Sequence, residues 1–247
     1  MKTYHLSALL LLFGCLPAFA STTGNYYGKA LCSHPNYDCV KVKGGKSWDR
    51  MFPDPKHRDI VQRVNRTYNY LWGGKTLAIP KNLDQITIFD VSPFPLAIGK
   101  TGEKQVIVDQ EKLAWGAYDA EGNLVKWGPI SSGKDYCPDI GKRCRTQTGV
   151  FRIFGKQNKR CRSRAFSANM PYCMFFYKGF AMHGSNDIPG KRASHGCIRM
   201  FTHDAKWLNY EFVSVSHKGN DFKGTKVIVQ ALHDDLKVRT SKRNRRR

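Results

Sequence analysis

Apolar and polar residues alternate along much of the second half of the chain, a pattern typical of β-strands with one buried face. The alternation is clearest in residues 104–109 (KQVIVD), 112–118 and 124–131. Residues 120–123 (AEGN), which precede the last of these segments, have the composition of a tight turn. Strands joined by short turns predict a meander, so we expect the larger part of the chain to be mainly β.

Apolar segments further along the chain predict additional buried strands at residues 170–176 and 179–182, and a closing strand at 224–229 (GTKVIV). A short helix is predicted at residues 202–208 (THDAKWL). Before the meander, residues 86–91 (ITIFDV) are predicted to form an extra edge strand. The expected architecture is therefore a mainly β domain with one or two helices.

The pattern is different in a preceding segment of the chain. Residues 39–43 (CVKVK) alternate like a strand, and Ser47 is suited to cap a helical turn. Residues 55–68 have the apolar spacing of an amphipathic helix, and residues 71–80 end in a short strand that stops at a proline. We therefore expect a small strand–helix–helix–strand module in front of the β domain.

The first twenty residues have the features of a secretory signal peptide. Lys2 precedes an apolar run, and Ala18-Phe19-Ala20 provides an A-x-A cleavage sequence. The run is too short to span a membrane, and no other stretch is long enough. A lipoprotein signal ending at Cys15 is the alternative, but Phe13 is unusual in that motif. We expect cleavage after Ala20 and a location in the periplasm or cell envelope.

Removal of the signal peptide leaves seven of the eight cysteines. An odd number in an oxidising compartment indicates one thiol without a partner. Six cysteines can pair in 15 ways, and the sequence does not decide among them. Pairing of neighbours would be the simplest arrangement and would leave Cys197 free. The other cysteines are Cys32, Cys39, Cys137, Cys144, Cys161 and Cys173.

The formal net charge of +22 indicates an anionic partner. Nucleic acid is not expected, because the chain looks exported and contains no zinc-finger or RNA-binding signature. Residues 237–247 hold seven basic residues and no acidic one. We therefore predict a disordered basic tail over residues 233–247.

The candidate chemistry lies in residues 181–200, AMHGSNDIPGKRASHGCIRM. This stretch contains Cys197 together with two imidazoles, His183 and His195. Cysteine acyl transfer requires a thiolate and a nearby base, and Gly196 would let the backbone approach a substrate closely. A zinc site is disfavoured because these three ligands lack a clear fourth.

His-Gly followed by Ser-His-Gly-Cys-Ile-Arg-Met resembles the signature of the L,D-transpeptidase (YkuD) catalytic domain, a family of cysteine enzymes that act on bacterial cell-wall peptides. Residues 146–153 (TQTGVFRI) are similar to the family's Thr-Pro-Thr-Gly-x-Phe-x-Ile segment, with Gln147 in place of the proline. The resemblance spans about residues 104–230. It implies a twisted β-sandwich catalytic domain over residues 100–232.

The resemblance also implies roles for individual residues. Cys197 would be the nucleophile and His183 the base that takes its proton. The carbonyl of Gly184 would orient the imidazole, and the N–H groups of Gly196 and Cys197 would stabilise the oxyanion. No metal ion or cofactor is expected. The residues expected to bind substrate are His195, Arg199, Ser194 and Tyr172.

The implied reaction is attack on the L,D peptide bond of a peptidoglycan tetrapeptide stem, release of D-alanine, and transfer of the acyl group to an amine of a second stem in a 3-3 cross-link. Hydrolysis as an L,D-carboxypeptidase, or attachment of stems to a lipoprotein, would use the same site. A non-catalytic wall-binding protein is a further alternative. A papain-type peptidase is disfavoured, because its cysteine would precede its histidine.

Residues 36–82 resemble a diverged LysM module, a βααβ domain that binds glycans containing N-acetylglucosamine. The resemblance depends on Val40-Lys41-Val42, on Gly45-Lys46-Ser47-Trp48 and on residues 74–80 (GKTLAIP). A small cap without a binding role is the alternative. The expected partner is thus peptidoglycan, through its stems and, by this module, its glycan.

Overall fold

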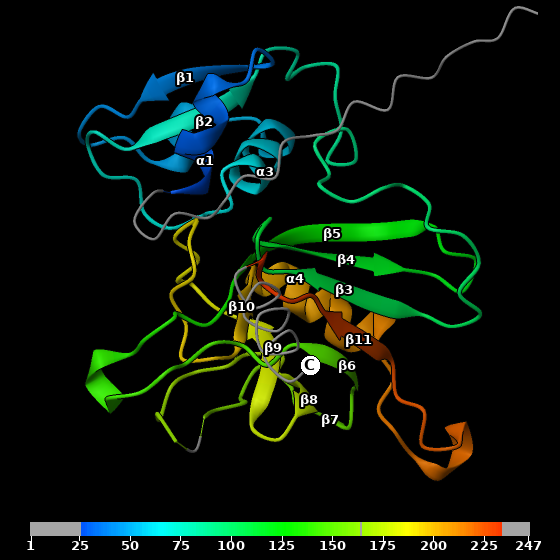
Figure 1. The fold of residues 1–247 in the computed structure, drawn as a ribbon. Helices are drawn as coiled ribbons and strands as arrows, with labels where there is room; N and C mark the ends of the chain where they lie inside the picture. Colours follow the sequence, from blue (N-terminus) through cyan, green and yellow to red (C-terminus); the bar gives the residue numbers. More distant parts are fainter. Residues whose placement is uncertain (1–25, 164, 234–247) are drawn as a thin grey trace, which may run out of the picture.

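The structure is a computed structural model that describes residues 26–163 and 165–233. It has a small N-terminal part with a two-stranded sheet and a larger part with a nine-stranded sheet (Figure 1). The predicted signal peptide, residues 1–20, lies outside the described residues. So does the predicted basic tail, residues 233–247, apart from His233.

The small part has the predicted order of strand, helix, helix and strand. Ser47 caps the first of these helices by accepting a hydrogen bond from the N–H of Arg50, as its position predicts. The two strands pair antiparallel, with Tyr37 opposite Pro80. A short helix, α1 (Tyr27–Ala30), precedes them. The elements are β1 (Tyr37–Lys41), α2 (Trp48–Met51), α3 (Pro55–Val64) and β2 (Thr76–Pro80).

Helix α3 is four residues shorter than predicted because Asn65 ends it. The buried amide of Asn65 donates to the carbonyls of Val61 and Ala78, each at 2.8 Å, and its oxygen accepts the N–H of Ala78 at 2.9 Å. These bonds satisfy the helix end and attach it to β2. Arg66 then adopts a left-handed conformation (φ 54°), and its guanidinium donates to the carbonyl of Lys112 in the large part.

The large sheet has the strand order β6-β11-β3-β4-β5-β10-β9-β8-β7. The pairs β11–β3 and β10–β9 are parallel, and the other pairs are antiparallel. The predicted meander and closing strand are confirmed. The strands are β3 (Gln105–Asp109), β4 (Ala114–Tyr118), β5 (Leu124–Ser131), β6 (Gly149–Arg152), β7 (Gly155–Lys156), β8 (Met174–Tyr177), β9 (Phe180–Gly184), β10 (Ile198–Met200) and β11 (Lys226–Val229).

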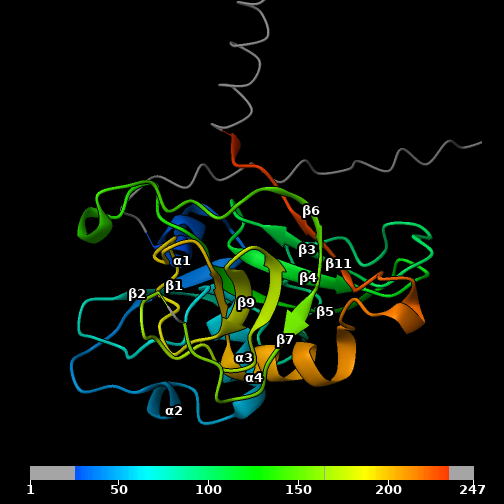
Figure 2. The same cartoon turned by 90° about the horizontal axis from the view of Figure 1, so that it is seen from below.

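The nine-stranded sheet curls on itself, so that β6 at one end approaches β8 near the other (Figures 1 and 2). Helix α4 (Thr202–Trp207), close to the predicted position, packs against β9. Burial of apolar side chains from strands far apart in the sheet order drives this closure. The result is the mainly β fold with few helices that the sequence predicts. The main core includes Val106, Val108, Trp115, Ile130, Met174, Met182, Ile198 and Met200.

The edge strand predicted at residues 86–91 is wrong, because this segment forms turns. The carboxylate of Asp90 accepts the N–H of Thr87 at 2.7 Å, and the carbonyl of Ile88 accepts the indole N–H of Trp127 at 2.6 Å. The apolar residues that suggested a strand instead cover the cores of both parts, which they join.

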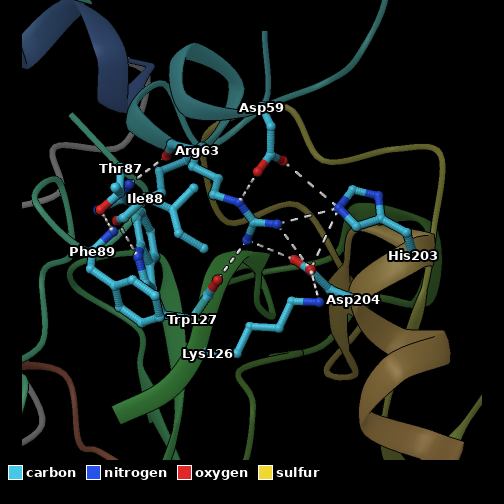
Figure 3. A network of polar contacts seen from close by, with 10 residues as sticks. Asp59, Arg63, Thr87, Ile88, Phe89, Lys126, Trp127, His203 and Asp204 are labelled. Atoms are coloured by element: carbon cyan, nitrogen blue, oxygen red, sulfur yellow. Dashed lines mark hydrogen bonds and ion pairs between the residues drawn. The ribbon is translucent and has the colours of Figure 1, made fainter. Parts of the chain in front are cut away.

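The two parts meet at a buried ion pair between Arg63 of α3 and Asp204 of α4 (Figure 3). Both Nη atoms of Arg63 donate to the Asp204 carboxylate at 3.0 Å, and Nε donates to Asp59 at 2.8 Å. Burial alone would lower the pKa of Arg63, but the two carboxylates raise it above its ordinary value. Lys126 and His203 complete the network. These bonds fix how the small part lies on the large one.

Candidate active site

Two neighbouring parallel strands bring together the predicted nucleophile and base. β9 carries His183, and β10 begins directly after Cys197. In the register of this pair, Arg199 lies opposite His183. Since alternate residues of a strand share a face, Cys197 and Arg199 lie on the face of His183, while Ile198 between them points into the core.

His183 is buried, and the neighbouring backbone fixes its tautomer. Its Nδ1–H donates to the carbonyl of Gly184, with 2.9 Å between the heavy atoms, because a carbonyl can only accept. This leaves the lone pair on Nε2. Burial lowers the pKa of His183 from 6.5 to about 4, although the Gly184 carbonyl acts to raise it, and the charge of Arg199 lowers it further. At neutral pH the imidazole is uncharged.

Cys197 is the free cysteine among the described residues. Burial raises the pKa of its thiol, while the Ala181 backbone and the charge of Arg199 act in the opposite direction. The resting pair is therefore a neutral thiol and a neutral imidazole. The other cysteines form the simplest of the considered arrangements, with the disulfides Cys32–Cys39, Cys137–Cys144 and Cys161–Cys173.

The residue before Cys197 and the residue after His183 are both glycines, and a side chain at either position would collide with neighbouring atoms. Gly196 has φ +123°, and a Cβ there would lie 2.6 Å from the ring of Phe180. At Gly184 a Cβ would lie 3.0 Å from the Cα of Thr202. A larger residue at either position would displace the backbone that presents Cys197 or holds the His183 ring.

Ser194 is buried, and its hydroxyl is bonded within the loop that carries the nucleophile. The hydroxyl donates to the carbonyl of Cys197 at 2.5 Å and accepts the N–H of Gly196 at 3.0 Å. Thr146, from the TQTG segment, donates to the carbonyl of Gly196 at 2.7 Å. The Gly196 N–H, a predicted oxyanion donor, is thus engaged by Ser194. Ser194 shapes this loop, and its contact with substrate stays a prediction that the geometry does not favour.

His195 lies beside a loop closed by the disulfide Cys137–Cys144. Its Nε2 lies 2.5 Å from a carboxylate oxygen of Asp139, and its ring is 4.9 Å from that of Phe166. Cys137, Asp139 and His195 bring potential metal ligands within 4.8 Å of one another. Because the sulfur of Cys137 is in a disulfide, this group offers only two ligand atoms, which is too few for a zinc site.

The remaining predicted substrate residues lie on either side of His183. Arg199 donates from Nη1 to the carboxylate of Asp187 at 2.5 Å. Tyr172 adopts a left-handed conformation (φ 59°), and its ring lies 5.7 Å from the ring of Tyr210. The structure thus gives Arg199 a defined ionic partner and Tyr172 an aromatic one.

Sequence reasoning missed two acidic partners and one amide. Asp187 lies within residues 181–200, so its closeness to Arg199 had a signal in the sequence. Asp139 had none, because only the folding of the disulfide-closed loop brings it to His195. Asn69 of the small part, which contacts Asp187, was equally undetectable.

Comparison with known proteins gives a family match to the L,D-transpeptidase (YkuD) catalytic domain over residues 103–229. A search of curated proteins finds no match. Among solved structures, an L,D-transpeptidase from Xylanimonas cellulosilytica is similar at 22% identity and TM-score 0.51, covering 71% of this chain and 79% of that one.

Two further solved structures are similar over shorter stretches. An L,D-transpeptidase from Stackebrandtia nassauensis is similar at 22% identity and TM-score 0.44, covering 57% of this chain and 61% of that one. An L,D-transpeptidase from Mycobacterium smegmatis is similar at 20% identity and TM-score 0.41, covering 52% of this chain and 59% of that one.

The matched residues, 103–229, make up slightly more than half of the chain and contain every strand of the large sheet. They also contain Cys197, His183 and the loop between them. The match does not include residues 36–82 of the small part. The Xylanimonas structure agrees independently in fold. The chain therefore belongs to the L,D-transpeptidase (YkuD) catalytic-domain family.

Proposed function

We propose that this protein is an exported peptidoglycan L,D-transpeptidase with Cys197 as nucleophile and His183 as general base. The observation that carries the proposal is an unpaired cysteine on the same sheet face as an imidazole whose Nδ1–H is held by the Gly184 carbonyl. Family membership supplies the reaction class, and this arrangement supplies the groups that the reaction needs.

In the first half-reaction, the sulfur of Cys197 attacks the carbonyl carbon of the L,D peptide bond in a tetrapeptide stem. Nε2 of His183 takes the thiol proton as the bond forms, because both groups are neutral in the resting enzyme. The imidazolium then gives this proton to the leaving nitrogen. D-Alanine departs, and the acyl group remains on sulfur as a thioester.

In the second half-reaction, an amine of another stem attacks the thioester carbonyl. Nε2 of His183 takes a proton from this amine, and the collapsing intermediate releases the sulfur of Cys197. The proton returns to the sulfur. A new amide bond then joins the two stems, and the enzyme is in its starting form.

Oxyanion stabilisation is assigned to the backbone N–H of Cys197. The N–H of Gly196 would join it only if the Ser194 hydroxyl released its hydrogen bond. Arg199 is proposed to bind a substrate carboxylate through its planar fork. His195 and Tyr172 are proposed to border the bound stem.

Two variants of the reaction use the same site. Water in place of the acceptor amine gives an L,D-carboxypeptidase, and a lipoprotein lysine gives protein attachment. A wall-binding protein without catalysis is the second candidate function. It is supported by exposed aromatic rings on the small part, Tyr70 and Trp72, which resemble a sugar-stacking surface.

The proposed location is the cell envelope, reached through the predicted signal peptide, residues 1–20. No helix formed by residues 26–163 and 165–233 has the length and apolar character needed to cross a membrane. Peptidoglycan is the proposed partner, with the strongly basic chain suited to its carboxylates.

Product analysis tests the proposed activity. The protein is incubated with a purified disaccharide-tetrapeptide, and the products are separated by liquid chromatography and identified by mass. The expected product is a cross-linked dimer that has lost one D-alanine. A tripeptide product would show that hydrolysis dominates. Absence of both products, at the level of a Cys197→Ala control, would contradict the enzyme function.

A further inference from the structure

The loop between the predicted base and nucleophile is held by the small part of the molecule. Asn69, which follows α3, donates from Nδ2 to one carboxylate oxygen of Asp187 at 2.9 Å. The side-chain oxygen Oδ1 of Asn69 accepts the N–H of Ile188 at 2.6 Å. One side chain of the small part therefore fixes both the carboxylate of Asp187 and the backbone that carries it.

Neighbouring contacts attach the rest of this loop, residues 185–190, to the small part. The hydroxyl of Tyr68 donates to the carbonyl of Ser185, and the N–H of Tyr27 donates to the carbonyl of Gly190 at 2.8 Å. Thr67 forms an isolated antiparallel bridge with Pro189. The small part thus holds the loop from its beginning to its end.

The second carboxylate oxygen of Asp187 accepts a hydrogen bond from Nη1 of Arg199 at 2.5 Å. A guanidinium has five N–H donors, and no hydrogen bond or ion pair of Arg199 other than this one is found within residues 26–163 and 165–233. One edge of the guanidinium is thereby fixed, and donors remain for a ligand. Arg199 also lies opposite His183 in the β9–β10 pair.

Space for a ligand lies directly beside Asp187. A pocket of about 520 Å³ opens there next to the Gly184 end of β9. Its lining includes a further cation, Lys159, whose side chain is exposed. The lining residues are Lys159, Asn169, Pro171, Ser185, Asn186 and Asp187.

We propose that Asn69 and Asp187 are positioning residues that orient Arg199 for a carboxylate of the substrate. The proposal rests on the proposed function, because it assigns Arg199 the stem as ligand. An exposed arginine–carboxylate pair alone is weak, since two flexible side chains must be ordered to form it. Here Asn69 holds the carboxylate in advance, so less conformational freedom is lost when a ligand binds Arg199.

This makes the small part a component of substrate recognition, whether or not it binds glycan. A substrate carboxylate would occupy the edge of the guanidinium that Asp187 leaves free. The alternative is that Asp187 competes with the substrate for Arg199. The two arrangements predict opposite effects of neutralising Asp187.

Binding measurements on an inactive background test the proposal separately from catalysis. In Cys197→Ala protein, the Kd of a synthetic tetrapeptide stem is measured by calorimetry, beside stems in which one carboxylate at a time is amidated. We expect amidation of one particular carboxylate to weaken binding. Asn69→Ala and Asp187→Asn should each weaken binding of the unmodified stem by about fivefold. They should leave binding of that amidated stem unchanged.

The matched control is Asn82→Ala, which removes an exposed amide of the small part. Among the described residues, the hydrogen bond found for Asn82 joins its backbone carbonyl to the N–H of Gln85, away from residues 185–190. Asn82→Ala should not change either Kd. In the active enzyme, Asn69→Ala should raise KM for the unmodified stem and leave kcat unchanged. A purely structural role would lower kcat, or weaken both stems equally.

Several results would overturn the proposal. Tighter binding in Asp187→Asn would show that Asp187 competes with substrate. Equal effects on the unmodified and amidated stems would remove the link to a carboxylate. If the active enzyme transfers acyl groups while these variants bind as the parent does, only the positioning role fails. If no stem binds at all, the proposed function fails with it.

Discussion

Two arginine–aspartate pairs lie along the junction of the small and large parts, and they differ in burial and in completeness. Arg63 and Asp204 are 2% and 0% exposed, and Nε and both Nη atoms of Arg63 are bonded. Arg199 and Asp187 are 21% and 60% exposed, and in the part of the chain that the structure describes a single Nη atom of Arg199 is bonded.

This difference separates a structural pair from a functional one. The guanidinium of Arg63 has carboxylate and backbone partners on all its nitrogens and nothing left for a ligand. Among the described residues, Arg199 bonds only to Asp187 and keeps unused donors, and Asp187 lines a pocket. The same two residue types therefore stabilise the junction in one place and prepare for a ligand in the other, and the number of unused donors decides which.

The largest effect is expected from breaking the buried pair. Asp204→Ala would leave the guanidinium of Arg63 buried with only Asp59 as carboxylate partner, so the free energy of unfolding should fall by about 3–5 kcal/mol. Urea unfolding measures this change. Asp38→Ala, which removes an exposed carboxylate on β1, is the control. A loss below about 1 kcal/mol for Asp204→Ala would show that the junction does not depend on this pair.

Arg199→Ala should weaken substrate binding strongly and change the free energy of unfolding little. Loss of charge-assisted hydrogen bonds to a substrate carboxylate is worth about 1.5–3 kcal/mol, so the Kd of a tetrapeptide stem should rise about tenfold or more. The free energy of unfolding should change by less than about 1 kcal/mol, because the pair with Asp187 is exposed. Calorimetric binding and urea unfolding on the same protein give both values. A large loss of stability without loss of binding would reverse the comparison.

The pH dependence of activity should report the environment of His183. Burial, as the largest cause, lowers the pKa of His183 to about 4, and only the neutral imidazole can take a proton. kcat/KM should therefore hold down to about pH 5 and fall as the pH drops through about 4. In Arg199→Ala this acid limb should move to higher pH, because a positive charge that lowers the pKa is gone. A limb near 6.5 in the parent enzyme would contradict the buried, neutral base.

The lowered pKa of His183 also makes the free energy of unfolding depend on pH. The pKa of His183 is lower in the folded protein than the unfolded value of 6.5, so the unfolded state binds the proton more strongly. The contribution of His183 to stability is full above pH 6.5 and is lost as the pH falls toward 4. Between pH 6.5 and 4, the free energy of unfolding should fall less for His183→Gln than for the parent protein.

The smallest effect is expected at a third pair, Arg152 and Glu103, on the surface. Hydrogen bonds from Arg152 and Lys226 lower the pKa of Glu103 to about 2. A depressed carboxyl pKa stabilises the fold above the unfolded value of 4.5, and this contribution is lost as the pH falls through about 2. Glu103→Gln should cost about 0.5 kcal/mol in urea unfolding at pH 7 and nothing below pH 2. An equal cost at both pH values would contradict an ionic origin.

The strand pattern predicted the meander, β8, β9 and β11, because these strands have apolar residues that the curled sheet buries. It did not predict the short strands β7 and β10. At residues 86–91 the same reasoning failed. There the apolar residues cover two cores while the backbone bonds elsewhere, as with Ile88 and Trp127. Periodicity reports which side chains are buried and does not report what the backbone pairs with.

The site was predictable as far as its chemistry is local. The odd number of cysteines and the SHGC sequence identified Cys197 as a candidate, and His183 followed from the same stretch. Contacts of Asn69 and Arg63 were not predictable, because they connect residues more than a hundred positions apart through the docking of two parts. A polar residue in a helix or turn gives no sign in the sequence of which distant partner will face it.

Intact-mass spectrometry tests the central assignment most directly. The mature protein is mixed with a disaccharide-tetrapeptide and sampled at short times, beside Cys197→Ala. We expect a transient adduct on the parent protein with the mass of the stem minus D-alanine, mapped to Cys197 and missing from the variant. An unmodified parent protein, in which Cys197 is shown to be reduced and open to alkylation, would contradict this assignment.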